Sequence, residues 1–175
     1  MILLADAGIP MLAVVWPVMW MVFLPVVVIE SLIAIKSLEL RFRRALLVTA
    51  AANAISTLVG IPVTWFVLVF VDIAMGGGGS HPIDTPMHAA IAVCKEAAWL
   101  CPYENDLDWK IPAAAIVLCV PFYFVSVWIE YFVVRRMVAN DFRQIRRFCW
   151  WANFWSYLAI VVFWMACILA SIYNG

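Results

Sequence analysis

The chain has 175 residues, of which 67% are hydrophobic and 13% are charged, and its formal net charge is zero. Soluble domains are about half apolar and about a quarter charged, so this composition excludes an ordinary soluble protein. It predicts one integral membrane domain that covers residues 1–175. A neutral chain has no net field to attract nucleic acid, so we expect the lipid bilayer and other membrane protein subunits as partners.

Four apolar segments are long enough to cross a bilayer, which takes about 20 helical residues. They run from Pro10 to Ile35, from Ala45 to Val71, from Ile111 to Val134, and from Phe148 to about Tyr173. The sequence therefore predicts an all-α integral membrane protein with four transmembrane helices. Its first ten residues, MILLADAGIP, include no basic residue, so we do not expect a cleaved signal peptide.

Pro25, Pro62 and Pro121 fall inside three of these spans. A proline ring removes one helical hydrogen bond and clashes with the carbonyl group four residues earlier. We expect bends at these positions that improve helix packing.

Nine of the eleven basic residues gather in the two short connections between spans. They are Lys36, Arg41, Arg43 and Arg44 in the first connection, and Arg135, Arg136, Arg143, Arg146 and Arg147 in the second. Loops rich in lysine and arginine stay in the cytoplasm. We therefore expect both termini and the loop 72–110 to lie outside the cytoplasm, in a bacterial-type inner membrane.

The two halves of the chain resemble each other at a fixed offset of 100 positions. Nine identities fall between positions 27 and 58, namely Val27/Val127, Ile29/Ile129, Glu30/Glu130, Phe42/Phe142, Arg43/Arg143, Ala52/Ala152, Asn53/Asn153, Ser56/Ser156 and Leu58/Leu158. Matching polar residues are uncommon between apolar helices. We therefore expect two parallel-repeated hairpins, with repeat 1 at about 10–71 and repeat 2 at about 111–173.

Each hairpin places three polar residues inside its spans. They are Glu30, Asn53 and Ser56 in repeat 1, and Glu130, Asn153 and Ser156 in repeat 2. At 1.5 Å per residue, Glu30 lies about 9 Å and Asn53 about 13 Å from the basic end, so the asparagine amide can donate to the facing carboxylate. We predict two Glu–Asn–Ser clusters in the cytoplasmic half of the bundle, with Arg43 and Arg143 as charge partners at its cytoplasmic end.

Two interpretations of these clusters are open. Buried polar groups hold membrane helices together, which fits our leading prediction, a non-catalytic accessory subunit of a larger membrane complex. Intramembrane carboxylates also carry ions and protons, which fits the alternative, a small transporter or ion- or proton-conducting protein. The sequence has no G-x-S-x-G, H-E-x-x-H or P-loop motif and no histidine inside a span. We therefore predict no catalytic residue, no metal and no cofactor.

The long loop begins with the flexible segment GGGGS at residues 76–80. Thr85 and Pro86 suit the N-cap and the first position of a helix. The residues that would form its apolar face are Met87, Ile91, Cys94 and Trp99. We expect a short helix on the outer membrane surface that ends by Pro102.

The cysteines of this loop predict a disulfide, whereas its metal-ligand residue types do not predict a metal site. Cys94 and Cys101 would lie on an oxidising face, so we predict a disulfide between them, provided that the helix breaks before Cys101. The metal-ligand types in the loop are His81, Asp84, His88 and Cys94, but their spacing matches no compact site.

Aromatic residues concentrate near the start of the fourth span, in the stretch FCWWANFW at residues 148–155. One interpretation is a belt at the membrane interface. The other, which we favour, is a face that packs against another membrane protein or a lipid.

Overall fold

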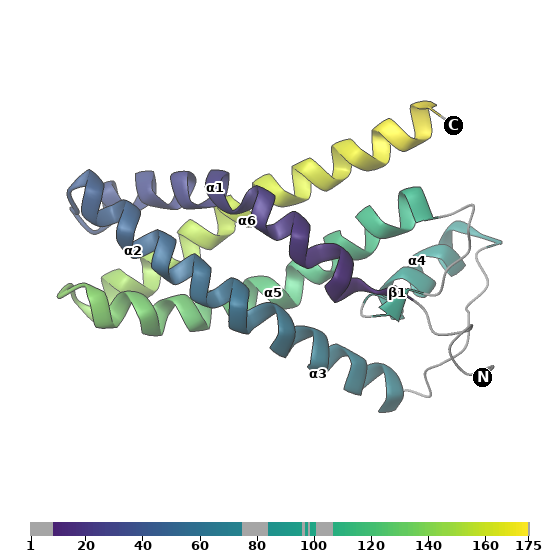
Figure 1. Cartoon of the computed structure of the whole chain (residues 1–175), viewed down its shortest axis with the longest axis horizontal. Helices are drawn as coiled ribbons and strands as arrows, with labels where there is room; N and C mark the ends of the chain where they lie inside the picture. The colour runs from purple at the N-terminus through teal and green to yellow at the C-terminus, as the bar shows by residue number, and fades with distance from the viewer. Residues whose placement is uncertain (1–8, 75–83, 96, 98, 101–106, 175) are drawn as a thin grey trace.

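The structure, a computed structural model, describes residues 9–74, 84–95, 97, 99–100 and 107–174. Four long helical segments make up most of the described chain, and Figure 1 shows how they lie against one another. Three of them are single helices, namely α1 (Met11–Ser37), α5 (Leu107–Met137) and α6 (Phe142–Asn174). The second segment along the chain consists of α2 (Phe42–Ile55), a π-helical stretch η1 (Ser56–Gly60) and α3 (Ile61–Ala74).

Each long segment is apolar and long enough to cross a bilayer. The four stretches are Trp16–Ser37, Phe42–Ala74, Asp108–Met137 and Phe142–Tyr173. They confirm the predicted all-α membrane protein with four helices. The helices also continue past the predicted apolar limits into the basic connections, since α1 ends at Ser37, α5 ends at Met137 and α6 begins at Phe142.

The two hairpins run in the same direction and turn at the same end of the molecule, which we call the connection end (Figure 1). Residues 38–41 link α1 to α2, and residues 138–141 link α5 to α6. The two turns start with equivalent backbone bonds of 2.9 Å, from the Leu38 N–H to the Ala34 oxygen and from the Val138 N–H to the Val134 oxygen. The opposite end, which carries α4, is called the loop end.

The second span widens into a π-helix just before a proline. Pro62 has no N–H group, and in a regular helix its ring would clash with the carbonyl oxygen of Leu58. A π turn shifts that carbonyl group, which accounts for the distortion at Ser56–Gly60. Gly60 also permits close approach to α5, because a Cβ atom there would lie 3.3 Å from the Cδ1 atom of Ile129.

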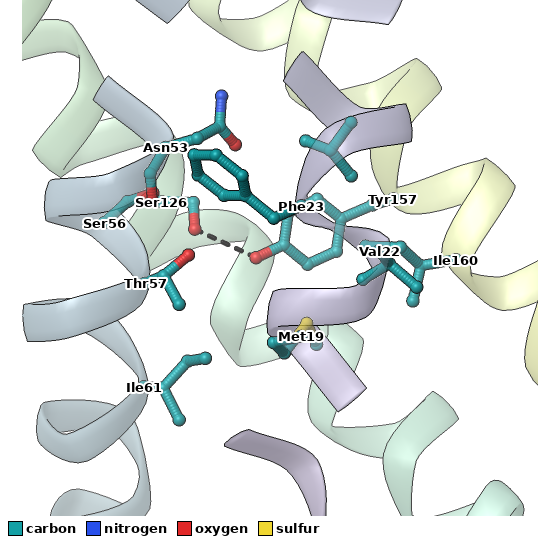
Figure 2. A pocket seen from close by; sticks show the side chains of 11 residues that line it. Met19, Val22, Phe23, Asn53, Ser56, Thr57, Ile61, Ser126, Tyr157 and Ile160 are labelled. Atoms are coloured by element: carbon teal, nitrogen blue, oxygen red, sulfur yellow. Dashed lines mark hydrogen bonds between the residues drawn. The ribbon is translucent and has the colours of Figure 1, made fainter. Parts of the chain in front are cut away.

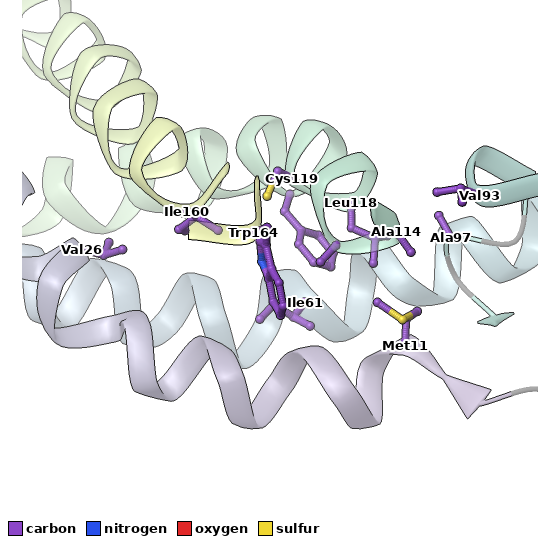
Figure 3. Packing of buried hydrophobic residues seen from close by; sticks show 12 residues of the cluster. Met11, Val26, Ile61, Val93, Ala97, Ala114, Leu118, Cys119, Ile160 and Trp164 are labelled. Carbon is purple, nitrogen blue, oxygen red and sulfur yellow. The ribbon is translucent and has the colours of Figure 1, made fainter. Parts of the chain in front are cut away.

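Apolar side chains pack in two clusters along the bundle. The cluster toward the loop end includes Met11, Leu118, Ile160 and Trp164, and in Figure 3 Trp164 points from α6 toward Ile61 of α3. The cluster toward the connection end consists mainly of Ala34, Ala45, Val48, Val134, Ile145 and Phe148. Between the two clusters lies a layer of buried polar residues, described below.

A short helix and a two-residue strand pair cover the loop end. Helix α4 (Pro86–Lys95) begins where predicted, since the Thr85 hydroxyl oxygen accepts the His88 N–H at 3.1 Å. Strand β1 (Ile9–Pro10) pairs antiparallel with β2 (Trp99–Leu100). The helix is shorter than its predicted apolar face, because it ends at Lys95 and Trp99 belongs to β2 (Trp99–Leu100).

The contact face of α4 also differs from the predicted apolar face. Ala92 and Val93 are buried, and α4 packs on α5, whereas Met87 and Ile91 are exposed. Small residues suit a close helix contact, which leaves the longer apolar side chains on the outside.

Cys94 is a free, exposed thiol near the end of α4, so the predicted disulfide between Cys94 and Cys101 is wrong. The helix does end before Cys101, at Lys95, as the predicted bond required, but the bond is absent at Cys94. Cys101, His81 and the GGGGS segment lie outside the described residues.

Candidate functional site

Two glutamates, Glu30 of α1 and Glu130 of α5, are buried in the middle layer of the bundle. Each is 1% exposed. A carboxyl group inside a membrane protein is expensive unless it finds partners in the protein interior. The two carboxyl groups therefore need hydrogen-bond donors from the surrounding helices.

Each glutamate accepts a hydrogen bond from the asparagine of its own hairpin. The Asn153 amide donates to the Oε2 atom of Glu130 at 2.6 Å, and the Asn53 amide donates to the Oε2 atom of Glu30. The structure thus forms both glutamate–asparagine pairs that were predicted from the similar depth of these residues in the membrane. Both asparagines also donate to the carbonyl oxygen four residues earlier, at 3.0 Å, which fixes the direction of the amide.

Each serine, in contrast, binds the glutamate of the other hairpin. The Ser156 hydroxyl donates to the Oε1 atom of Glu30 at 2.9 Å, and the Ser56 hydroxyl donates to the Oε1 atom of Glu130 at 3.1 Å. The prediction of two separate clusters is therefore corrected to one cluster. A serine three residues beyond an asparagine is rotated by about 300° and shifted by about 4.5 Å along the helix, so it reaches the other hairpin.

The single cluster ties all four spans together. Glu30 on α1 is held from the second span by Asn53 and from α6 by Ser156, and Glu130 on α5 has the mirrored pair of donors. All four carboxylate oxygens therefore accept a hydrogen bond from another span. Such bonds stabilise membrane bundles by about 0.6 kcal/mol each, and an unmet buried acceptor costs more.

The structure does not bring Arg43 and Arg143 to the carboxyl groups. Both side chains are exposed, and the Arg143 guanidinium lies 5.7 Å from the centre of the Phe142 ring. Among the described residues, no ion pair joins either glutamate to a basic side chain. The glutamates are therefore held by neutral donors.

A small cavity adjoins the cluster on its loop side. It measures about 40 Å³ and is lined by Asn53, Ser56, Thr57, Tyr157 and several apolar side chains. Figure 2 shows the Tyr157 hydroxyl group hydrogen-bonded to Ser126 across this space, at 2.9 Å. A cavity of this size and polarity has room for a water molecule.

One polar atom of the cluster has no partner within the described part of the chain, namely the buried Oδ1 atom of Asn153. Carboxylate, amide and hydroxyl oxygens are the ligands that hard cations prefer. Here, however, the carboxylate oxygens are already engaged in bonds between helices. The arrangement is therefore suited to holding helices, with one small polar space beside it.

A second set of bonds between hairpins lies at the connection end and was not predicted from the sequence. The Arg44 guanidinium donates to the Met137 carbonyl oxygen at 2.6 Å, and the Gln144 amide donates to the Ser37 carbonyl oxygen at 2.7 Å. The positions correspond at the offset of 100. The residue types differ, and the acceptors are backbone atoms, so sequence identity gave no signal for these contacts.

Comparison with protein-family models, with curated proteins and with solved structures finds no match for this chain. The fold and the site define its class: a small multi-pass membrane protein of four helices with one enclosed polar cluster.

Proposed function

We propose that this chain is a non-catalytic accessory subunit of a larger membrane protein complex. The observation that carries the proposal is that both carboxyl groups are fully engaged: both glutamates are 1% exposed, and each of their oxygens accepts a hydrogen bond from another span. A transport site needs access for its cargo, whereas helix–helix bonds need only donors and acceptors. The glutamates then give the four spans a fixed arrangement that can present a constant surface to a partner.

The exposed side of α6 supports the same proposal. Only 17% of its apolar stretch is buried, against 44% for the stretch in α5. The exposed aromatic residues on α6 near the cluster are Trp150, Trp151, Phe154 and Trp155. Tryptophan is enriched among residues that dominate binding energy at protein interfaces, so this side of α6 is the proposed partner surface.

Extraction of the native membrane in mild detergent, followed by native mass spectrometry, tests the proposal. We expect the 19.8 kDa chain to be released in fixed stoichiometry with another membrane protein. The double variant Phe154→Leu with Trp155→Leu should lose that partner. The matched control, Trp128→Leu with Phe132→Leu, changes two exposed aromatic residues of α5 and should retain it. A chain released alone under all conditions contradicts the proposal.

The second candidate is a small transporter or an ion- or proton-conducting protein that uses the Glu–Asn–Ser cluster. The cavity of about 40 Å³ beside Asn53 and Ser56, together with the unpartnered Asn153 Oδ1 atom, favours it. Purified chain in lipid vesicles with a trapped pH-sensitive dye separates the two functions. If the chain is an accessory subunit, vesicles that contain it should leak protons no faster than vesicles without protein. A leak that disappears in Glu30→Gln replaces the accessory proposal.

We also infer that the hairpins descend from one duplicated hairpin. The support is the set of nine identities and the matching hydrogen bonds at equivalent positions. Charge supports an orientation with the connection end in the cytoplasm, because nine of the eleven basic residues lie there. Enzyme reporters fused to the C-terminus test this orientation. One that works only outside the cytoplasm should be active, and activity of a cytoplasm-dependent reporter contradicts it.

A further inference from the structure

A groove opens between α1 and α6 at the connection end of the bundle. Its volume is about 660 Å³, and its lining includes one basic side chain from each helix, Lys36 and Arg147. The Gln144 amide donates to the Ser37 carbonyl oxygen at 2.7 Å, which holds the two helices together at this groove.

The groove is basic at its rim and apolar one helical turn deeper. Leu32 precedes Lys36 by four residues, and Trp151 follows Arg147 by four residues, so each lies about 6 Å nearer the bundle centre than its basic neighbour. The lining contains no acidic residue. Within the described ranges, no carboxylate forms an ion pair with Lys36 or Arg147. The charges at the rim are thus available to an anion.

We propose that this groove binds one anionic phospholipid. Its phosphate group lies between Lys36 and Arg147, and one acyl chain follows Leu32 and Trp151 toward the bundle centre. Lys36 lies in the last turn of α1 and Arg147 in the second turn of α6, toward the basic end of the bundle where we expect lipid phosphates to lie. Basic pockets between membrane helices bind anionic headgroups in this way, and the guanidinium of an arginine matches a phosphate group.

The equivalent place between α5 and α2 provides an internal comparison. At the offset of 100, Lys36 corresponds to Arg136, but Arg147 corresponds to Leu47 and Trp151 to Ala51. The equivalent place on the α2–α5 side therefore lacks the second basic residue of the rim and the aromatic residue below it. Arg44, which replaces Gln144 there, already donates to the Met137 carbonyl oxygen. The site is consequently expected on the α1–α6 side alone.

Native mass spectrometry of the full-length chain in detergent tests the proposal, with phosphatidylglycerol and phosphatidylcholine of identical acyl chains as probes. We expect the wild type to retain one phosphatidylglycerol about ten- to thirty-fold more tightly than phosphatidylcholine, as two basic contacts imply. Lys36→Gln with Arg147→Gln should remove the preference, and Lys36→Arg with Arg147→Lys should keep it. The matched control Arg136→Gln changes an exposed basic residue at the equivalent position and should also keep it.

Several results overturn the proposal. Equal affinity of the wild type for both lipids excludes a headgroup site, and an equal loss in Arg136→Gln indicates general surface charge. Displacement of the lipid by inorganic phosphate at comparable concentration assigns the groove to a soluble anion. A doubled chain mass that depends on Lys36 and Arg147 assigns it to a second copy of the chain.

Discussion

The chain has two hairpins, the first formed by α1 to α3 and the second by α5 and α6. The two hairpins surround their buried glutamates with the same residue types, but they pack the loop end with different residue types. Around the cluster, the buried positions coincide: Val27 and Val127, Ala52 and Ala152, Asn53 and Asn153. Toward the loop end the equivalent residues diverge. Thr57 corresponds to Tyr157, Gly60 to Ile160, and Thr64 to Trp164.

This divergence is complementary in volume. Where the second span carries a small residue, α6 carries a large one, and both face the same interior, since Thr57 and Tyr157 line one cavity. A bundle interior has a limited volume to fill, so enlargement on one side requires reduction on the other. Hydrogen-bonding geometry, in contrast, allows little change in either hairpin. The comparison therefore separates residues that are constrained by bonds from residues that are constrained by volume.

The largest expected effect comes from Trp164, where the hairpins differ most. Trp164→Ala removes a 6% exposed side chain from the loop-end cluster and should lower the free energy of unfolding by about 3–5 kcal/mol. Its counterpart Thr64 has a buried hydroxyl oxygen that is without a partner within the described residues. Thr64→Ala should therefore change the stability by less than about 1 kcal/mol. Unfolding in detergent measures both, and equal effects would contradict the volume argument.

The asparagines should give the next largest effect, and here the hairpins should behave alike. Asn53→Leu and Asn153→Leu each leave a buried carboxyl group short of a donor, which costs about 1–3 kcal/mol. Removing both partners, as in Asn53→Leu with Glu30→Leu, should destabilise the chain less than Asn53→Leu alone. The same order should hold for Asn153 and Glu130. Unfolding of the single and double variants in detergent tests this, and simple additivity would show that the pairs are not coupled.

The serines should contribute less and should reveal the crossed pattern. A hydrogen bond between membrane helices is worth about 0.6 kcal/mol. Ser156→Ala should therefore couple by about this amount with Glu30→Leu, and less with Glu130→Leu, because Ser156 binds the glutamate of the other hairpin. A double-mutant cycle for each glutamate measures the difference. Stronger coupling to Glu130 would restore the arrangement of two separate clusters.

The sequence predicts the content of the cluster better than its connections. The depths of Glu30 and Asn53 follow from helical rise, since both are counted from the same basic end. The crossing of Ser56 and Ser156 depends on how one hairpin is rotated against the other, and an offset between identical residues carries no information on that rotation. The hydrogen bond between Ser126 and Tyr157 was not predicted either. The equivalent residues of the first hairpin, Val26 and Thr57, differ from them, so the repeat gave no signal.

The loop end was predicted less well for a different physical reason. Thr85 specifies the start of α4 through a local bond to the His88 N–H, so the sequence predicts it correctly. The chain after α4 instead forms β2, which pairs with β1 about 90 positions away in the chain. A contact of that range leaves no periodic signal in the sequence.

The smallest expected effect is that of Arg43 and Arg143, which are identical in both hairpins but lie outside the cluster. Substitutions of exposed residues usually change stability by at most about 0.5 kcal/mol. Arg43→Gln and Arg143→Gln should therefore each leave the free energy of unfolding within that limit, in contrast to Asn53→Leu. Unfolding in detergent at low salt makes the test strict, since exposed ion pairs are strongest there. A loss above about 1 kcal/mol that disappears in a Glu30→Leu background would make Arg43 a partner of the buried carboxyl group.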